Sequence, residues 1–209
     1  KGGIPKLILL AEFSGDIPEE IKARVEAAKK SLARYPVSSR QAANKEEADK
    51  YMVMRRESFN LLRKHVRGMK AAPFIDDIIV PAASLEQFLP KLQAVLALYP
   101  KLLYTIAGHV GDGNLHIIPL LSFNDAHTKT MITELIGKVH RLVLDFKGSI
   151  TAEHNDGIIR TPFLKQMYGE KIVELFEKTK QAFDPTDIFN PGKKVRGTIE
   201  YMMNHIDGL

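Results

Sequence analysis

Residues 102–121 read LLYTIAGHVGDGNLHIIPLL, and this stretch decides the fold class. Two apolar runs, 102–107 and 115–121, each have the length of a strand, and a short glycine-rich loop separates them. A connection this short has no room for a crossover helix, so it folds the second strand back on the first. Because helical segments occur on both sides, the stretch favours an α+β fold over a doubly wound parallel sheet.

Strand and helix signals alternate along the rest of the chain. A short apolar run at residues 7–13, between Pro5 and Gly15, predicts a buried strand. Periodicity and flanking residues predict further short strands at 77–80 and 149–152, and helices at about 18–34, 45–69, 84–98, 124–146, 161–168 and 170–183. The expected fold is an antiparallel sheet with ferredoxin-like βαβ elements and helices on one face. Residues 184–194, with Asp-Pro and Asn-Pro-Gly, predict an ordered, turn-rich tail.

The composition is that of a soluble globular protein and excludes several classes of function. The 209 residues are 44% hydrophobic and 26% charged, which excludes collagen-like and disordered chains. No run approaches 18 apolar residues, and the first residues show no signal-peptide pattern, so we expect neither a membrane span nor secretion. The absence of cysteine excludes disulfides, thiolate nucleophiles and iron–sulfur ligation, and it fits a reducing compartment. Any metal must therefore be held by histidine and carboxylate.

The positive charge is concentrated in one part of the chain. The net charge is +5, and residues 22–70 contain 14 Lys and Arg against 5 Asp and Glu. Such a segment could bind nucleic acid or a membrane surface, but its aromatic residues do not alternate with the charges as a stacking platform requires. We therefore expect a solvated helical face, or a surface that meets another protein domain, and no nucleic-acid partner.

The loop between the two central strands contains candidate metal ligands. His109 and His116 bracket it, and a tight turn can bring both imidazoles to one point. Glu153 ends a short apolar strand and precedes a glycine-containing turn, which makes it the candidate carboxylate. Two imidazoles and a carboxylate form an open three-ligand site for Zn, Mn or Fe. Asp112 is a candidate fourth ligand or a partner that orients an imidazole.

The same residues also have an ordinary interpretation. Two histidines seven positions apart are more often plain polar residues than ligands, and Asp112 and Asn114 are common turn residues. Glu153 alone would be a surface carboxylate. We expect the remaining histidines to lie in solvent, on helical or terminal segments: His65, His127, His140 and His205.

Three motifs, in this order, resemble the C-terminal domain of FAD-linked oxidases. They are HVGDGNLH at 109–116, AEHNDG at 152–157 and FDPTDIFNPGK at 183–193. That family includes the D-lactate dehydrogenases, the glycolate oxidase flavoprotein subunit and D-2-hydroxyglutarate dehydrogenase, within the vanillyl-alcohol-oxidase superfamily. The resemblance covers nearly the whole chain. It implies a substrate- and metal-binding cap domain at residues 1–183 and a C-terminal return segment at 184–209 that packs on an FAD domain outside this chain.

The resemblance also implies a reaction, partners and a location. The family oxidises a 2-hydroxy acid to the 2-oxo acid and passes a hydride to FAD, so the chain alone is expected to be inactive. Its expected partners are the small 2-hydroxy acid and an FAD-binding domain or subunit, with a peripheral membrane or electron-acceptor partner and a homo-oligomer left open. The expected location is cytoplasmic, with peripheral attachment to the inner membrane as an alternative.

Functional residues carry over from the family by position. The metal ligands, for Zn, Mn or Fe, match three residues: His109, His116 and Glu153. His154 matches the general base that takes the proton of the substrate hydroxyl. Arg56 matches an arginine that binds the substrate carboxylate, although it also belongs to a basic helical stripe. Asn190 matches the segment that packs against the flavin domain.

Two positions depart from the members that select dicarboxylates. Those members have lysine where this chain has Ile75, and asparagine where it has Ile118, two positions after the second metal histidine. Both changes remove polar contacts, which favours a D-lactate- or glycolate-like substrate over a 2-hydroxyglutarate-like one. The alternative function is a non-catalytic metal- or carboxylate-binding domain, or an adaptor subunit of a flavoprotein.

Overall fold

The chain forms two compact units that divide between Phe59 and Asn60. The computed structural model describes residues 7–65, 68–122 and 127–206, and the side chains of 58–65 lie outside this description. The division expected from the resemblance, 1–183 and 184–209, concerns packing on a flavin domain. It therefore stays a prediction.

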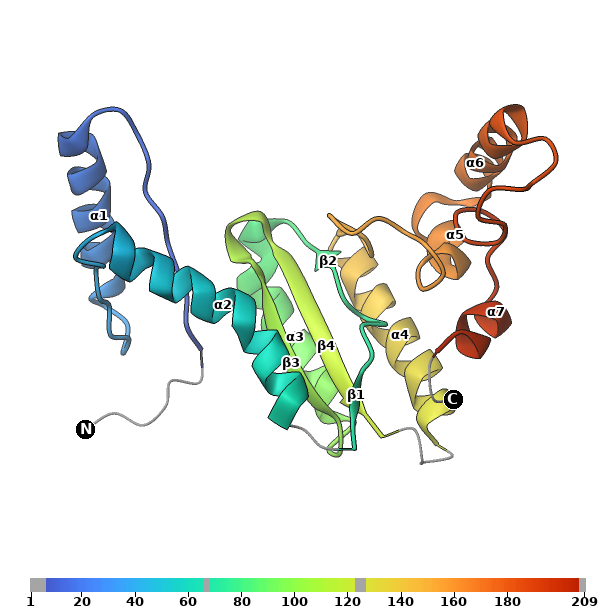
Figure 1. Ribbon diagram of the computed structural model, residues 1–209, viewed down its shortest axis with the longest axis horizontal. Helices are drawn as coiled ribbons and strands as arrows, with labels where there is room; N and C mark the ends of the chain where they lie inside the picture. Colours follow the sequence, from blue (N-terminus) through green and yellow to red (C-terminus); the bar gives the residue numbers. More distant parts are fainter. Residues whose placement is uncertain (1–6, 66–67, 123–126, 207–209) are drawn as a thin grey trace. The chain divides into compact units, whose positions relative to one another are not determined.

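Helix α1 and most of helix α2, which continues past the division at 59–60, account for the regular structure described in the first unit (Figure 1). α1 spans Pro18–Leu32 and α2 begins at Lys45 and ends at His65, so the second helix is a little shorter than predicted. α1 has proline at its start, two glutamates in its first turn and two lysines in its last, as the helix dipole favours. The side chain of Asn44 accepts a hydrogen bond from the N–H of Glu47 at 3.0 Å, which caps α2.

Residues 7–13 do not form the predicted buried strand. Leu7, Ile8 and Leu9 are 71%, 62% and 65% exposed, and their backbone is not in a strand. A buried strand needs a neighbouring strand to bond its backbone and a layer of side chains to cover it. Within residues 7–59, α1 and α2 are the regular elements that the structure describes, and α1 buries none of its residues. The prediction is therefore wrong for this segment.

The second unit is built on an antiparallel sheet centred on β4 (Figure 1). β3 (Leu103–His109) and β4 (Asn114–Leu121) form the predicted hairpin, joined by the short 3₁₀ helix η2 (Val110–Asp112). β1 (Lys70–Ala71) and β2 (Ile78–Ile79) pair with the two ends of β4, and all of these pairs are antiparallel.

A single bridge extends the sheet beyond β2. Ser149 pairs with Ile79, so the strand expected at 149–152 is reduced to one bridge. Across the sheet the order is Ser149, β2, β4, β3, and the elements follow one another as strand, helix, two strands, helix and bridge. The description of these elements as ferredoxin-like stays a prediction. The α+β class and the antiparallel sheet are confirmed.

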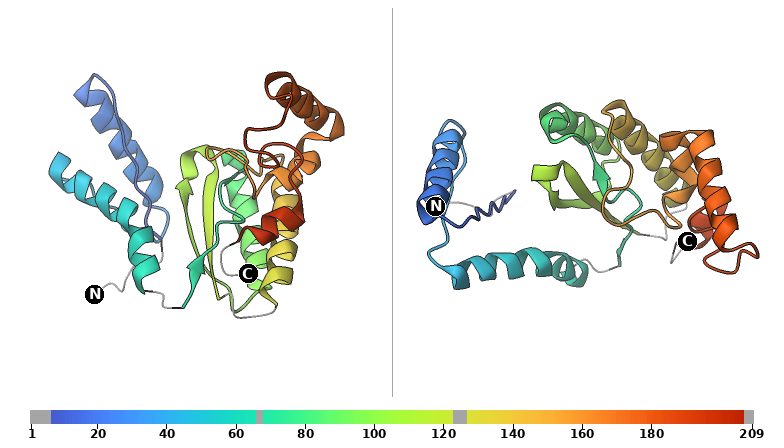
Figure 2. Two further views of the ribbon diagram at one scale, coloured as in Figure 1. Left: turned by 45° about the vertical axis from the view of Figure 1, so that its right-hand side comes forward. Right: turned by 90° about the horizontal axis from the view of Figure 1, so that it is seen from above.

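Two long helices cover one face of this sheet (Figure 2). α3 (Leu85–Ala97) follows the 3₁₀ helix η1 (Ala82–Ser84), and α4 (Thr128–Asp145) follows the hairpin. Their inward residues recur at helical spacing and pack against alternate residues of β4. The core contains, among others, Phe88, Leu92 and Leu96 of α3, Ile132, Leu135, Ile136, Val139 and Val143 of α4, and Leu115, Ile117 and Leu121 of β4.

The C-terminal part of the unit contains short helices and turns. The segment predicted as one helix at 161–168 consists of the 3₁₀ helix η3 (Thr161–Phe163) and α5 (Leu164–Tyr168), followed by α6 (Glu170–Phe183) and α7 (Ile199–Asn204). The turn-rich tail is ordered around Asp184, whose buried carboxylate accepts hydrogen bonds from the N–H groups of Ile188 and Phe189 at 3.0 and 2.9 Å. None of the described helices is long and apolar enough to cross a bilayer.

His140 does not lie in solvent as expected. It is 1% exposed on α4, and its ring meets that of Phe163 edge to face at 4.9 Å. Burial, together with the positive charge of Arg160, lowers the pKa of His140 to about 4. The ring is therefore a neutral part of the packed interior.

Candidate metal centre

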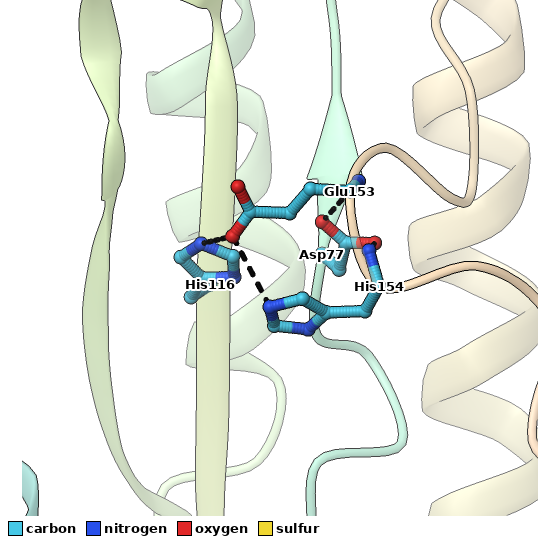
Figure 3. Close-up of side chains that lie close together, drawn as sticks. All are labelled: Asp77, His116, Glu153 and His154. Atoms are coloured by element: carbon cyan, nitrogen blue, oxygen red, sulfur yellow. Dashed lines mark hydrogen bonds and ion pairs between the residues drawn. The ribbon is translucent and has the colours of Figure 1, made fainter.

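The hairpin, the residue before β2 and the loop after Ser149 bring four side chains with ligand atoms together (Figure 3). Asp77, His116, Glu153 and His154 offer atoms that lie within 4.8 Å of one another. Glu153 Oε1 is the common point, 3.0 Å from His116 Nε2 and 3.1 Å from His154 Nε2. Atoms that bind one Zn²⁺ ion at about 2.0–2.2 Å are themselves roughly 3 Å apart, so these separations suit a shared cation.

His109 lies at the margin of this group. Its Nε2 is 3.5 Å from Glu153 Oε2, and its ring centre is 5.8 Å from that of His116. The register pairs His109 with Asn114 and Ala107 with His116, so both histidines project from the same face of the hairpin. The structure thus gathers His109, His116 and Glu153, while their role as metal ligands stays a prediction.

Asp76 is a residue that the sequence did not single out. It contacts the imidazoles of His116 and His154 at the Nδ1 atoms, on the side away from Glu153. Its Oδ1 is 3.1 Å from His116 Nδ1, and its Oδ2 is 3.2 Å from His154 Nδ1. A carboxylate accepts hydrogen bonds, so in the neutral rings the two Nδ1 atoms carry the hydrogens. The Nε2 lone pairs of both rings are then directed toward Glu153. The rings themselves stack at 4.9 Å, with 14° between their planes.

This arrangement tests whether the residues fit a metal. Two imidazole lone pairs directed at one carboxylate oxygen repel it, unless a proton or a cation lies between them. Metal-bound histidines commonly donate their other ring N–H to a carboxylate, which is the role that Asp76 has here. Neutral imidazole and carboxylate together suit Zn, Mn or Fe. The donor set of His116, Glu153 and a further histidine therefore fits a divalent metal.

Asp77 has a different role from the other three members of the group. Its fully buried carboxylate accepts hydrogen bonds from the backbone N–H groups of Ala152, Glu153 and His154 at 3.0, 3.1 and 2.9 Å. Asn114 Nδ2 donates to it as well, at 3.1 Å. Burial works to raise the pKa of Asp77, but these hydrogen bonds outweigh it and hold the pKa below its usual range. Asp77 therefore anchors the loop and has little capacity left for a metal.

The other candidate residues lie outside this group. Asp112 is exposed in η2. Arg56 is exposed on α2 in the first unit, and Asn190 is exposed in the turn-rich tail, where its carbonyl accepts a hydrogen bond from the N–H of Lys193 at 3.2 Å. The roles of Arg56 in substrate binding and of Asn190 toward the flavin stay predictions.

The two isoleucines that depart from the dicarboxylate pattern have different surroundings. Ile75 is fully buried in the core, so its side chain contacts other apolar groups. Ile118 is partly buried and lies on the same face of β4 as His116, two residues away. Ile118 therefore lies on the face of the sheet that carries the candidate centre, whereas Ile75 lies in the core.

A comparison with protein families identifies the chain. Residues 5–194 match the family described as FAD linked oxidases, C-terminal domain. The chain belongs to this family. The resemblance found in the three motifs is thereby confirmed, and the hairpin and the loop at 152–157 of this FAD-linked oxidase domain both lie within the matched residues.

Curated relatives of this FAD-linked oxidase domain are larger proteins. D-2-hydroxyglutarate dehydrogenase of Pseudomonas putida is 30% identical over 190 residues, which cover 89% of this chain and 19% of the relative. Glycolate oxidase subunit GlcD of Bacillus subtilis is 28% identical over 92% of this chain and 41% of its own length. A probable mitochondrial D-lactate dehydrogenase of Danio rerio is 32% identical over 60% of this chain and 25% of its own length. The chain thus spans less than half the length of each of these relatives.

Proposed function

We propose that the chain is the substrate- and metal-binding part of an FAD-dependent 2-hydroxy-acid dehydrogenase or oxidase. The observation that carries this proposal is the convergence of His116 Nε2 and His154 Nε2 on one oxygen of Glu153, with Asp76 behind both rings. The family supports the reaction class, which is the oxidation of a 2-hydroxy acid to the 2-oxo acid with FAD as hydride acceptor. The activity of the whole protein is part of the proposal.

In this proposal, His109, His116 and Glu153 hold a divalent Zn, Mn or Fe ion. When bound, such an ion acts as a Lewis acid that makes the hydroxyl of a 2-hydroxy acid more acidic. Glu153 and His109 are about half exposed, at 46% and 45%, whereas His116 is 12% exposed. The centre is therefore anchored at His116 and open on the side of the other two ligands, where a small acid can approach.

His154 is proposed as the general base that accepts the hydroxyl proton. Its Nδ1–H is held by Asp76, so its Nε2 keeps a lone pair, and its side chain is 49% exposed to an incoming substrate. After Nε2 has taken the proton, the negative charge of Asp76 stabilises the imidazolium. The same pair of atoms thus orients the ring and supports its charged form.

The proposed substrate is a small 2-hydroxy acid of the D-lactate or glycolate type. Ile118 places an apolar side chain beside His116, which suits a short aliphatic substrate better than one with a second carboxylate. Arg56 is proposed to bind the single carboxylate of this substrate, because a planar guanidinium pairs well with it. Asn190 and the segment 184–209 are proposed to face the FAD-binding part of the protein. A cytoplasmic location belongs to this proposal, with peripheral attachment to the inner membrane as the alternative, and an electron-acceptor partner and a homo-oligomer are left open.

Metal analysis of the purified, untagged protein tests the centre. We expect near-stoichiometric Zn, Mn or Fe in the wild type and loss of the metal in His116→Ala. His205→Ala is the matched control, because His205 is exposed beyond α7, and it should keep the metal. A wild type that remains free of metal after reconstitution would contradict the proposed centre.

Turnover by the full-length protein tests the reaction. With its FAD-binding part present, the protein should oxidise D-lactate or glycolate with a higher kcat/KM than D-2-hydroxyglutarate, and His154→Ala should lower kcat by about 10²–10⁴-fold. Bound metal without turnover of any 2-hydroxy acid would favour the alternative, a non-catalytic metal- or carboxylate-binding domain.

A further inference from the structure

The buried guanidinium of Arg160 donates hydrogen bonds to three backbone carbonyls, two of them in the segment that carries Glu153 and His154. Nε donates to the carbonyl of Ile150 at 3.1 Å, and Nη1 donates to that of Asn155 at 3.0 Å. Nη2 donates to the carbonyl of Asp76 at 2.7 Å, and the side chain is 8% exposed. One buried cation thus fixes both ends of the segment 150–155 and joins it to the residue that orients the two imidazoles.

Asp77 binds the middle of the same segment through its N–H groups. Its carboxylate accepts from three consecutive backbone N–H groups, those of residues 152–154, and from the side chain of Asn114 on the hairpin. Arg160 Nη2 lies 3.9 Å from Asp77 Oδ2, so the two buried charges compensate each other. The segment is therefore held at its carbonyls by Arg160 and at its N–H groups by Asp77.

The backbone at 151–156 has no other regular support. It forms neither helix nor strand, so no ladder of backbone hydrogen bonds fixes where Glu153 and His154 lie. The catalytic and ligating groups of a site are held within about 0.5 Å only where surrounding contacts fix the backbone and the side chains. Asp77 and Arg160 supply those contacts for this half of the centre.

We propose that Asp77 and Arg160 form a buried clamp that positions Glu153 for metal binding and His154 beside it as the general base. Both are positioning residues, since they bind the backbone of the segment and contact neither the metal nor the substrate. The proposal rests on the proposed function insofar as the positioned groups bind a metal. Its physical core, that the two buried charges set the conformation of 150–155, can be measured without a metal.

Two substitutions test the clamp against one matched control. Arg160→Lys keeps the positive charge but cannot reach three carbonyls at once, and Asp77→Asn places an amide donor among N–H groups that need acceptors. Asp184→Asn is the control. Asp184 is also buried, also accepts backbone N–H groups and also contacts a cation, Lys180, but it lies in the tail outside the centre.

Each variant is measured in two ways, after circular dichroism and thermal unfolding have shown that it is folded. Amide hydrogen exchange without metal should show slow exchange at residues 152–154 in the wild type and at least about tenfold faster exchange in both clamp variants. Competition titration with Zn²⁺ should show about 10- to 100-fold weaker binding in the clamp variants. Asp184→Asn should match the wild type in both measurements.

The outcomes separate the clamp from the proposed function. Fast exchange at residues 152–154 in the wild type, or unchanged exchange and Zn²⁺ affinity in folded Arg160→Lys, overturns the clamp. A wild type with protected amides that binds no Zn²⁺ contradicts the metal centre and, with it, the positioning role, while the clamp's effect on the backbone is still read from exchange. If Asp77→Asn fails to fold, the charge-conserving Arg160→Lys decides the matter.

Discussion

The two halves of the candidate centre are held in place by different means. On one side, His109 and His116 project from paired strands, where continuous antiparallel pairing between β3 and β4 fixes their backbone. On the other side, Glu153 and His154 lie in an irregular segment that depends on Asp77 and Arg160. The strand half is thus secured by neighbours in sequence, whereas the loop half also depends on contacts between residues 75–84 positions apart.

This difference shows where the site is vulnerable. A paired hairpin keeps its geometry if one side chain is changed, because many backbone hydrogen bonds share the load. The irregular segment relies on a few buried polar groups, so the loss of one leaves others unsatisfied. We therefore expect the geometry of the strand half to be lost mainly by substitutions that strain its backbone. The geometry of the loop half should be lost by substitutions that remove one of its buried polar side chains.

The largest effect is expected at Gly113, in the strand half. This residue has φ +79°, and a Cβ there would lie 1.9 Å from the carbonyl oxygen of Val80. Gly113→Ala should lower the free energy of unfolding by about 4 kcal/mol or more, because the clash is with backbone and the conformation is left-handed. Gly111→Ala, in the same loop with nothing within 4 Å, should change it by less than about 0.5 kcal/mol in urea denaturation. Equal free energies of unfolding for the two variants would contradict the predicted clash at Gly113.

The next effect concerns pH and the buried histidine beside Arg160. The pKa of His140 is about 4 in the folded protein, against 6.5 for the free group, so the unfolded chain takes up a proton first as the pH falls. Stability supplied by the neutral ring is present above pH 6.5 and is lost toward pH 4, by roughly 3 kcal/mol.

Urea denaturation at several pH values measures this loss. His140→Gln cannot be protonated, so its free energy of unfolding should fall less steeply between pH 6.5 and 4 than that of the wild type. Parallel profiles for the two proteins would mean that His140 is not a neutral buried group.

A smaller effect is expected at the residue that joins the two halves. Asp76→Asn presents one acceptor and one donor to two ring N–H groups, so one imidazole loses its orientation. Zn²⁺ affinity should fall about 10- to 100-fold, or about 1.4–2.8 kcal/mol, with little change in unfolding. Asp112→Asn, at an exposed acid in the same hairpin, should bind Zn²⁺ like the wild type. A lower Zn²⁺ affinity in Asp112→Asn but not in Asp76→Asn would contradict this prediction and indicate that the metal ligands lie nearer the tip of the hairpin.

The smallest effect is expected at Gly157, in the loop half. It has φ +80°, as Gly113 does, but nothing lies within 4 Å of an added Cβ. Gly157→Ala should therefore cost only the strain of a left-handed alanine, about 1 kcal/mol in the free energy of unfolding. A loss as large as that of Gly113→Ala would show that the loop is packed as tightly as the hairpin.

The sequence predicted the strand half well because its signals are local. Two apolar runs around a glycine-rich loop specify a hairpin, and the register then puts His109 and His116 on one face. The helices around it were predicted within a few residues for the same reason. The apolar run at 7–13 failed because apolar character does not specify which strand would pair with it.

The parts that were missed depend on contacts between distant segments. Asp76 and Asp77 stand together inside an apolar stretch, which is a signal that buried charges need partners, but nothing nearby in the sequence names His116, His154 or Arg160. His140 was within reach of local reasoning. It lies four residues after Ile136 and three before Val143, on the face of α4 that enters the core.

The long sequence separations within the centre have a kinetic consequence. The hydrogen bonds from the loop to Asp77, and from Arg160 to the carbonyl of Asp76, form only after segments 76 and 84 residues apart have come together. Because chain closure over such distances delays contact formation, these groups are expected to assemble after the folding transition state. A metal that binds only the fully folded centre would then lower the unfolding rate and leave the folding rate nearly unchanged. The bound ion would thus give the native state kinetic stability.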